Sequence, residues 1–176
     1  MILDAGRCGE GRRLLEKRGD HLLGVEAISQ ALMTGCFIGV GPGSSPAEAE
    51  EHLGAAVRQL HGRRPHRFLR LDFGLVEATF TGEPDWVCHW LSINTHRLAD
   101  IPSLAEECAE RYGLTFSERV TWGQLSPEIR NRADLVDTPP HAVRYRFSAV
   151  KATAHLSESP EGDELGQVIE KISIGI

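Results

Sequence analysis

The side chains that most often bind metals or act as nucleophiles are histidine and cysteine, and the chain holds eight and four of them. No two cysteines form a C-x-x-C pair, and the histidines form neither an H-x-x-x-H helix nor an H-x-H strand pattern. His89 and His96 are an odd number of residues apart and would point to opposite faces of a strand. The sequence therefore predicts no metal centre, no cofactor and no local catalytic signature. It predicts four reduced, mostly buried thiols: Cys8, Cys36, Cys88 and Cys108.

The most basic stretch, residues 61–70, carries two histidines and four arginines, whose guanidinium groups bind carboxylates and phosphates well. The arginines are Arg63, Arg64, Arg67 and Arg70. A second anion-binding feature is the Gly41–Ser45 turn, where Ser44, Ser45 and backbone N–H groups precede an expected helix. Together they suggest a small-molecule or nucleotide-binding domain. The alternative is a solvent-exposed loop and a structural turn, since prolines 42 and 46 remove two donors and no Gly-Lys-Ser/Thr ending follows.

Charge is divided unevenly along the chain. Residues 1–70 sum to +2 and residues 71–176 to −8, which gives the net charge of −6. Acidic side chains and aromatic residues expected at the surface could bind a basic partner protein. These candidate residues are Glu106, Glu107, Glu110, Glu158, Glu161, Asp163, Glu164, Trp86 and Trp122. The alternative is that the acidic groups only keep the protein soluble. With a pI near 5.7 and no RNA- or DNA-binding motif, nucleic acid is an unlikely partner.

Length and hydropathy indicate one ordinary globular domain. With 176 residues, 41% of them hydrophobic, the chain can bury a sizeable core. No apolar run approaches the 18 residues that a membrane span needs, and no signal-peptide pattern is found at the start. We therefore expect a cytoplasmic protein that does not enter the membrane. Its organisation would be a leader at residues 1–19 and a single α+β domain at residues 20–176.

Capping patterns predict the helices. Apolar residues at helical spacing follow Asp20 and continue to Gly35. The segment 45–54 holds a Ser-x-x-Glu capping box, a proline at the first helical position and a final glycine. A second Ser-x-x-Glu box begins a helix over 103–113, and a Thr-x-x-Gln box at 121–124 begins a weak one because Gly123 and Pro127 follow.

Alternating patterns predict the strands. Residues 68–80 form two of them, separated by a bend at Asp72-Phe73-Gly74. Residues 86–98 form a third, with Trp86, Cys88 and Trp90 on one face. Residues 143–156 and 165–176 close the chain as a hairpin. We find no internal repeat. The sequence therefore predicts an α+β fold whose mostly antiparallel sheet has about five strands, a three-strand meander plus the hairpin, with N-terminal and central helices packed on it.

Three runs within residues 38–98 carry a resemblance. They are Ser45-Pro46-Ala47-Glu48-Ala49-Glu50 with Leu53-Gly54, the segment 68–77, and Trp86 with Ile93-Asn94-Thr95-His96-Arg97-Leu98. These runs resemble small immunity-type proteins of bacterial polymorphic-toxin systems in high-GC Gram-positive bacteria. The helix and hairpin also resemble inhibitor and assembly-factor domains. The resemblance implies a cytoplasmic protein that binds and neutralises a cognate toxin without chemistry of its own, and it carries over no catalytic residue.

Three function hypotheses follow. The first is a non-catalytic protein-binding module of the immunity type, whose partner would be a basic toxin. The second is the small-molecule or nucleotide-binding domain that would use the Arg63–Arg70 loop and the Gly41–Ser45 turn. The third, an enzyme using Cys88 or a histidine, is the least favoured because no catalytic motif accompanies these residues.

Overall fold

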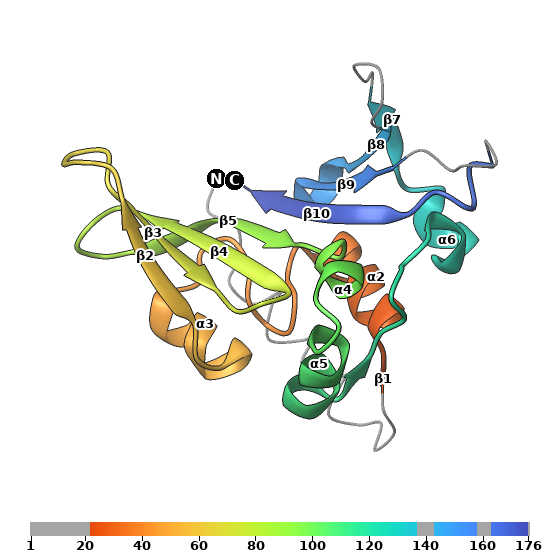
Figure 1. Ribbon diagram of the computed structural model, residues 1–176. Coiled ribbons are helices and arrows are strands. Elements are labelled where there is room, and N and C mark those ends of the chain that lie inside the picture. Colours follow the sequence, from red (N-terminus) through yellow and green to blue (C-terminus); the bar gives the residue numbers. More distant parts are fainter. Residues whose placement is uncertain (1–21, 137–142, 158–162, 176) are drawn as a thin grey trace.

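An antiparallel sheet organises the structure, a computed structural model that describes residues 22–136, 143–157 and 163–175. In these residues the sheet has eight strands in the order β2-β3-β4-β5-β10-β9-β8-β7 (Figure 1). They are β2 (Val57–His61), β3 (Phe68–Asp72), β4 (Val76–Thr81), β5 (Val87–Ile93), β7 (Asp134–Val136), β8 (Val143–Phe147), β9 (Ala152–Leu156) and β10 (Ile169–Gly175). The α+β class and the mostly antiparallel sheet are confirmed, whereas the number of about five strands was wrong.

Two four-stranded meanders meet at the centre of this sheet. We call β2–β5 the N-terminal half and β7–β10 the C-terminal half. Their last strands, β5 and β10, pair antiparallel, with Leu91 opposite Ile174 and Ser92 opposite Ser173. The strand order of one half is therefore mirrored in the other about the β5–β10 junction. The sequence carries no repeat that would signal this organisation.

Physical reasons explain why the sequence patterns predicted fewer strands than the sheet contains. Residues 57–61 pair with 72–68 along their whole length, but β2 is an edge strand whose side chains are mostly exposed, so it shows no apolar alternation. The predicted single strand over 143–156 is two strands, β8 and β9. Lys151 takes a left-handed conformation (φ 52°) after the 3-10 turn η2 (Ser148–Val150) and reverses the chain there.

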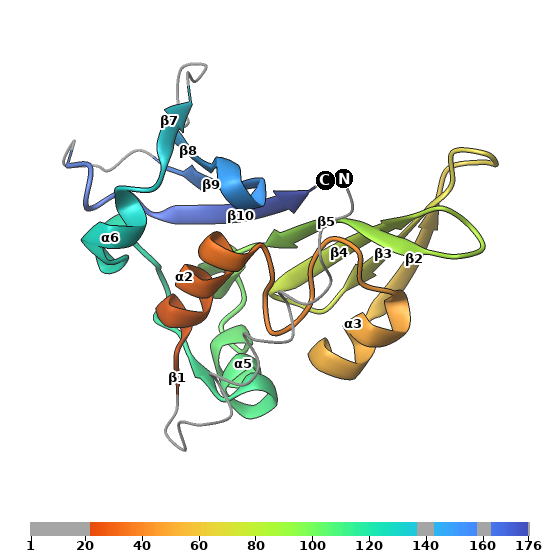
Figure 2. The same cartoon turned by 180° about the vertical axis from the view of Figure 1, so that it is seen from behind.

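The helices cover one side of the sheet. They are α2 (Gly24–Thr34), α3 (Pro46–Leu53), α4 (Arg97–Asp100), α5 (Leu104–Tyr112) and α6 (Pro127–Arg130), with the 3-10 turn η1 (Trp122–Gln124) and a short parallel pair of β1 (Leu22–Leu23) with β6 (Leu114–Thr115). Figure 1 shows α2, α3, α4 and α5 on the same side, and Figure 2 shows α2, α3 and α5 there from behind. Apolar side chains of these helices, such as Ile28, Leu53 and Leu104, join Leu71 and Ile174 of the sheet in one buried core. The opposite side of the sheet carries none of these four helices.

Helix ends follow the capping chemistry in most cases. The Ser45 hydroxyl accepts the backbone N–H of Glu48 at 3.2 Å, and the Glu48 carboxylate accepts that of Ser45 at 2.7 Å, so the predicted box is confirmed. Two details were wrong. The first helix begins at Gly24 rather than after Asp20, because Leu22 and Leu23 pair with β6. The Ser103 hydroxyl donates to the Glu107 carboxylate at 2.8 Å and does not cap α5.

A β-bulge changes the faces of β5. Thr79 lies opposite Trp90 and Phe80 lies opposite Cys88, so His89 is an additional residue in this strand. Cys88 consequently points into the core and Trp90 points to the side without helices. The prediction that Trp86, Cys88 and Trp90 share one face was wrong. It assumed that every second residue lies on the same face, and the additional residue His89 breaks this alternation.

The cysteines divide into two groups. Cys88 and Cys108 are free and buried, as predicted. Cys36 is disulfide-bonded, so the prediction of four reduced thiols was wrong at this residue. Disulfides are typical of oxidising compartments, and the cytoplasmic location stays a prediction. In the described ranges no helix is long and apolar enough to cross a membrane. The expected leader at 1–19, Cys8 and two acidic candidates, Glu158 and Glu161, lie outside these ranges.

Candidate binding surface

The side of the sheet away from the helices, which we call the open face, is lined mainly by polar side chains. One unbroken cross-strand row runs over all eight strands: Val57, Asp72, Glu77, Ser92, Ser173, Thr153, Arg146 and Asp134. Side chains two residues apart along each strand share this face, since a strand alternates with a period of two. Polar side chains are common on the face of an antiparallel sheet away from the core, although Ser92 and Ser173 at the centre of this row are only 3% exposed. The features of interest are therefore the residues that depart from the polar pattern.

Trp90 is the first residue that departs from this polar pattern. It lies on the central strand β5 of the open face and is 41% exposed. Its Nε1–H donates to the Ser92 hydroxyl at 3.1 Å. The ring also lies against Gly175 of β10, where an added Cβ would stand 2.4 Å from Trp90 Cε3. A neighbouring strand and a hydrogen bond thus hold a large, partly exposed aromatic ring in one orientation.

Charged side chains of β3, β4 and α4 form a paired network at the N-terminal half of the sheet. The Arg97 guanidinium donates to Asp72 Oδ1 at 3.0 Å and to the carbonyl oxygen of Gly74 at 2.6 Å, and it also pairs with Glu77. Arg70 pairs with the same Glu77 carboxylate. Asp72 accepts the backbone N–H of Gly74 (φ 89°) at 2.9 Å, which confirms the predicted bend. Two cations and two carboxylates therefore neutralise each other and fix the β3–β4 turn to α4.

The C-terminal half carries a second row of charge on the open face, and this one is not paired. Arg144 of β8 lies opposite His155 of β9, and His155 lies opposite Lys171 of β10. Among the described residues, none of these three side chains makes a hydrogen bond or ion pair, and the Arg144 Nε is buried without an acceptor. Burial, together with the positive charges of Arg144 and Lys171, lowers the pKa of His155. We call these three residues the basic row.

The basic stretch predicted from the sequence forms the tip of the β2–β3 hairpin, which projects from one end of the sheet (Figure 1). Glu83, on the neighbouring β4–β5 turn, accepts from Arg64 at 2.8 Å and from Arg67 at 3.4 Å. The Arg64 guanidinium lowers the pKa of the Glu83 carboxyl. Arg63 is exposed at the tip. Two of the four predicted anion-binding arginines are thus occupied at the tip, and Arg70 belongs to the paired network.

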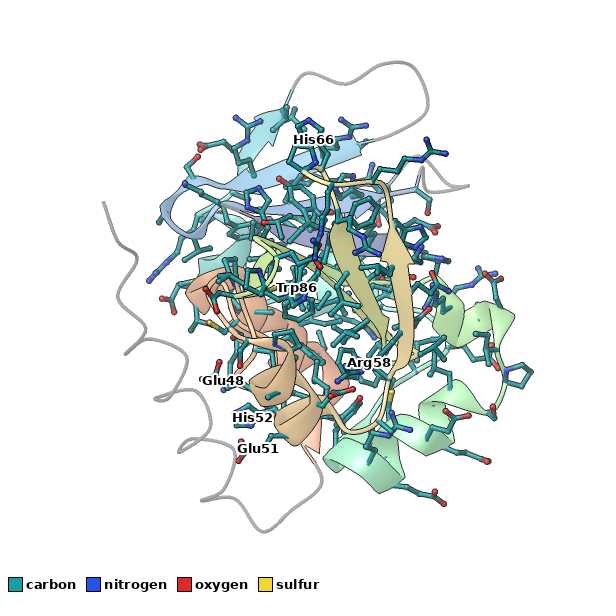
Figure 3. All side chains as sticks on the ribbon, turned by 90° about the vertical axis from the view of Figure 1, so that its left-hand side faces the viewer. Glu48, Glu51, His52, Arg58, His66 and Trp86 are labelled. Carbon is teal, nitrogen blue, oxygen red and sulfur yellow. The ribbon has the colours of Figure 1, made fainter. Side chains whose placement is uncertain are left out.

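The Gly41–Ser45 turn does not join that hairpin tip. Ser44 accepts the backbone N–H of Gly41 at 3.3 Å, and Ser45 caps α3. The backbone of the turn pairs with Cys88 at the start of β5. In Figure 3, His66 at the hairpin tip and Glu48 of α3 lie towards opposite ends of this side of the molecule. The structure therefore does not bring together the basic stretch and the Gly41–Ser45 turn, the two features of the predicted anion site.

The acidic candidates lie on separate parts of the structure. Glu106, Glu107 and Glu110 are exposed on α5, below the sheet in Figure 1, whereas Asp163 and Glu164 are exposed in the segment that leads into β10. Glu164 accepts the Tyr145 hydroxyl at 2.6 Å, and burial together with this carboxylate raises the pKa of Tyr145 to about 12. The structure therefore does not gather these residues on one face.

The aromatic candidates also differ from expectation. Trp122 is only 1% exposed and stacks on Tyr145, with ring centroids 4.3 Å apart, so its expected exposure was wrong. Trp86 is half-buried against the core. The more exposed tryptophan is Trp90, which sequence analysis placed on the wrong face. The basic row was missed as well. Its signal was present in the alternation of 143–156, where Arg144, Arg146 and His155 occupy the positions between apolar residues.

The cysteines and histidines offer little chemistry where the structure describes them. Burial raises the pKa of the Cys88 thiol to about 12 and that of Cys108 to about 11, so both stay protonated at neutral pH. Residues 22–136, 143–157 and 163–175 contain no group of three metal-ligating side chains. The described residues thus present a surface with an aromatic centre and two kinds of charge.

These features define an α+β domain that covers one face of an antiparallel sheet and leaves the other open. No family model and no curated protein matches the chain. Among solved structures, a DUF4309 family protein (YjgB) from Bacillus subtilis subsp. subtilis str. 168 is similar, with 12% sequence identity and a TM-score of 0.40. The match covers 86% of this chain and 94% of that chain. A similarity of this size carries no argument about function.

Proposed function

We propose that this protein is a non-catalytic protein-binding module of the immunity type, which binds and neutralises a toxin through the open face of its sheet. The observation that carries the proposal is Trp90. Tryptophan is enriched among the residues that dominate protein interfaces, because it buries a large apolar area around one polar N–H group. The contacts with Gly175 and Ser92 hold the ring in place before binding, so little side-chain entropy is lost when a partner covers it.

Further apolar surface on the same face supports a protein as the partner. Val87 is 42% exposed and lies opposite Thr81, so it shares the open face with Trp90. Phe68 and His61, stacked with centroids 4.9 Å apart, flank it on β3 and β2. Aromatic residues and arginine are typical of interface centres. The resemblance of residues 38–98 to immunity-type proteins supports a toxin as the partner, and that segment includes β3, β4 and β5.

The other two functions have less support. A nucleotide or phosphorylated ligand would need the hairpin arginines free, and Glu83 already pairs with Arg64 and Arg67. An enzyme using Cys88 would need an accessible thiolate, and this thiol is fully buried with a pKa raised to about 12. We therefore place the function at the open face.

The test compares the full chain with its Trp90→Ala variant in capture from host lysate at physiological salt. A protein that co-purifies with the wild type in stoichiometric amount is then expressed alone in a test bacterium. We expect this partner to arrest growth, co-expression of the wild type to restore it, and Trp90→Ala to raise Kd by about 30-fold, or about 2 kcal/mol.

Leu135→Ala is the matched control, since it removes another exposed apolar side chain from the distant edge strand β7. This variant should bind and protect like the wild type. A partner without toxicity, or a complex that Trp90→Ala leaves equally tight, would overturn the proposal.

A further inference from the structure

The three side chains of the basic row stand directly opposite one another on three adjacent strands. Arg144 pairs in register with His155, and His155 with Lys171. Opposite residues in an antiparallel pair have Cβ atoms about 5 Å apart, so the whole row spans about 10 Å. Arg146 lies two residues from Arg144 on the same face and adds a fourth basic group.

Such a row is unfavourable for the isolated sheet. Arg144 and Lys171 repel each other across the neutral His155 ring, and protonation of that ring would place like charges directly opposite each other on neighbouring strands, which destabilises the pairing. A buried N–H donor without an acceptor, as at Arg144 Nε, adds a further cost. In the described residues the nearest acid in register is Asp134, opposite Arg146, and its carboxylate accepts from the Ser148 hydroxyl at 3.3 Å. The arrangement becomes favourable once a negatively charged group binds.

Arginine, lysine and protonated histidine all donate to carboxylates through charge-assisted hydrogen bonds. The row is also continuous with the proposed contact surface. On β10, Gly175 beneath the Trp90 ring, Ser173 and Lys171 follow each other at every second residue on the open face. Lys171 therefore lies about 14 Å along the strand from the position of Trp90. One protein segment can reach both.

We propose that the basic row is a carboxylate-binding site that takes an acidic segment of the partner protein. This inference rests on the proposed function, which supplies the partner, and it changes the expected chemistry of that partner. A basic toxin was expected from the net charge of −6, but the row offers positive charge on the same face as Trp90. Charge complementarity at a contact is set by the local groups, while the net charge governs long-range steering.

Binding of a carboxylate to the basic row should be coupled to the uptake of a proton by His155. The charged groups in register beside His155 are Arg144 of β8 and Lys171 of β10, with Arg146 of β8 diagonal to it, all positive; the acid beside them is Glu170, the additional residue at the register shift in β10, next to Lys171. The positive groups and burial favour the neutral imidazole, so its pKa is lowered in the free protein. A carboxylate placed beside the ring favours the imidazolium instead. Binding should therefore take up a proton and become tighter as the pH falls from 8 to 6.

The experiment is calorimetric titration of the full chain with a decaglutamate peptide at low ionic strength. Separate arms use inorganic phosphate and a ten-nucleotide single-stranded DNA. We expect the peptide to bind, and Lys171→Gln to weaken binding by about tenfold. Lys151→Gln, which removes the same charge from the same half outside the row, should change it by less than about twofold. His155→Gln should remove the rise in affinity between pH 8 and pH 6.

The outcomes separate this inference from the proposed function. Absence of peptide binding, equal effects of Lys171→Gln and Lys151→Gln, or tighter binding of phosphate or DNA through the same residues would each overturn the carboxylate site. None of these results changes the role of Trp90. If Trp90→Ala leaves the partner complex intact while the peptide still binds the row, the proposed function fails and the anion site stands.

Discussion

The two halves of the sheet treat their basic residues in opposite ways on the same open face. At the N-terminal half, Arg70 of β3 and Arg97 of the adjoining α4 are held by Glu77 and Asp72 in a partly buried network. In the C-terminal half, Arg144, His155 and Lys171 face one another, and no described acid pairs with them. The strand order is mirrored, yet the first set contributes to the fold and the second is available to a ligand. Residue type alone therefore does not tell a stabilising arginine from a binding one.

The paired network and the basic row should respond to the removal of one charge with opposite changes in the free energy of unfolding. Removing one partner from a partly buried network leaves the other charge desolvated, which is strongly destabilising. Removing one member of an unpaired row relieves repulsion and costs nothing in pairing. Stability measurements on matched variants can therefore test whether the two halves differ as described.

The largest effect is expected for Arg97→Ala at the N-terminal half. This change leaves the Asp72 and Glu77 carboxylates and the Gly74 carbonyl without their shared donor. We expect the free energy of unfolding to fall by about 3 kcal/mol, at the lower end for a buried pair because these groups are about one-fifth exposed. Urea denaturation at pH 7 measures it. Arg132→Ala, which breaks an exposed pair with Glu128, should cost less than about 0.5 kcal/mol. Equal losses would show that the network is not stabilising.

Gly175→Ala tests the contact that joins the halves at Trp90. An added Cβ would meet the indole ring at 2.4 Å, so the ring must move away from β10. We expect a loss of about 2 kcal/mol in the free energy of unfolding, as for an overpacked site. In the Trp90→Ala background the same glycine substitution should be nearly neutral, because the obstructing ring is absent. A double-mutant cycle by denaturation measures this, and additive effects would show that the ring does not lie on Gly175.

A smaller effect concerns pH and the C-terminal half. The pKa of His155 is lowered in the folded protein by burial and by Arg144 and Lys171. Below its ordinary value near 6.5, the unfolded chain binds a proton that the folded chain does not. The contribution of His155 to stability is therefore complete above pH 6.5 and is lost as the pH falls towards the lowered value. We expect the wild type to lose more stability than His155→Gln between pH 7.5 and pH 5.5. Parallel pH profiles for the two proteins would contradict this.

Capping and turn chemistry were the parts of the fold that could be predicted from the sequence. The Ser45 box, the end of α5 at Gly113 and the bend at Gly74 depend on contacts within a few residues, and each forms in the structure. The α+β class followed from the alternating segments. Strand number did not, because β2 is an exposed edge strand and because β8 and β9 are separated only by the 3-10 turn η2 and the left-handed Lys151.

The candidate surface was harder to predict, because it depends on register. Because of a single bulged residue, His89, Trp90 lies on the open face and not on the face of Cys88, where the alternation placed it. The basic row needs three strands to align Arg144, His155 and Lys171, and the third strand, β10, begins 13 residues after the end of β9. Net charge pointed to the acidic residues instead, and those residues are divided between α5 and the segment before β10. Local composition does not report which side chains meet across a sheet.

The smallest expected effect is a gain in the free energy of unfolding, opposite in sign to the loss expected for Arg97→Ala. Lys171→Ala removes the positive charge that repels Arg144 across the neutral His155 ring, without leaving any described acid unpaired. We expect the free energy of unfolding to rise by a few tenths of a kcal/mol at about 20 mM salt, which is the size of cross-strand charge effects. The gain should disappear near 1 M salt, where the Debye length falls to about 3 Å. Lys151→Ala, outside the row, should show no salt-dependent gain, and denaturation at the two salt concentrations measures both. A loss of stability in Lys171→Ala would mean that this lysine is paired like Arg97, and the contrast between the two halves would fail.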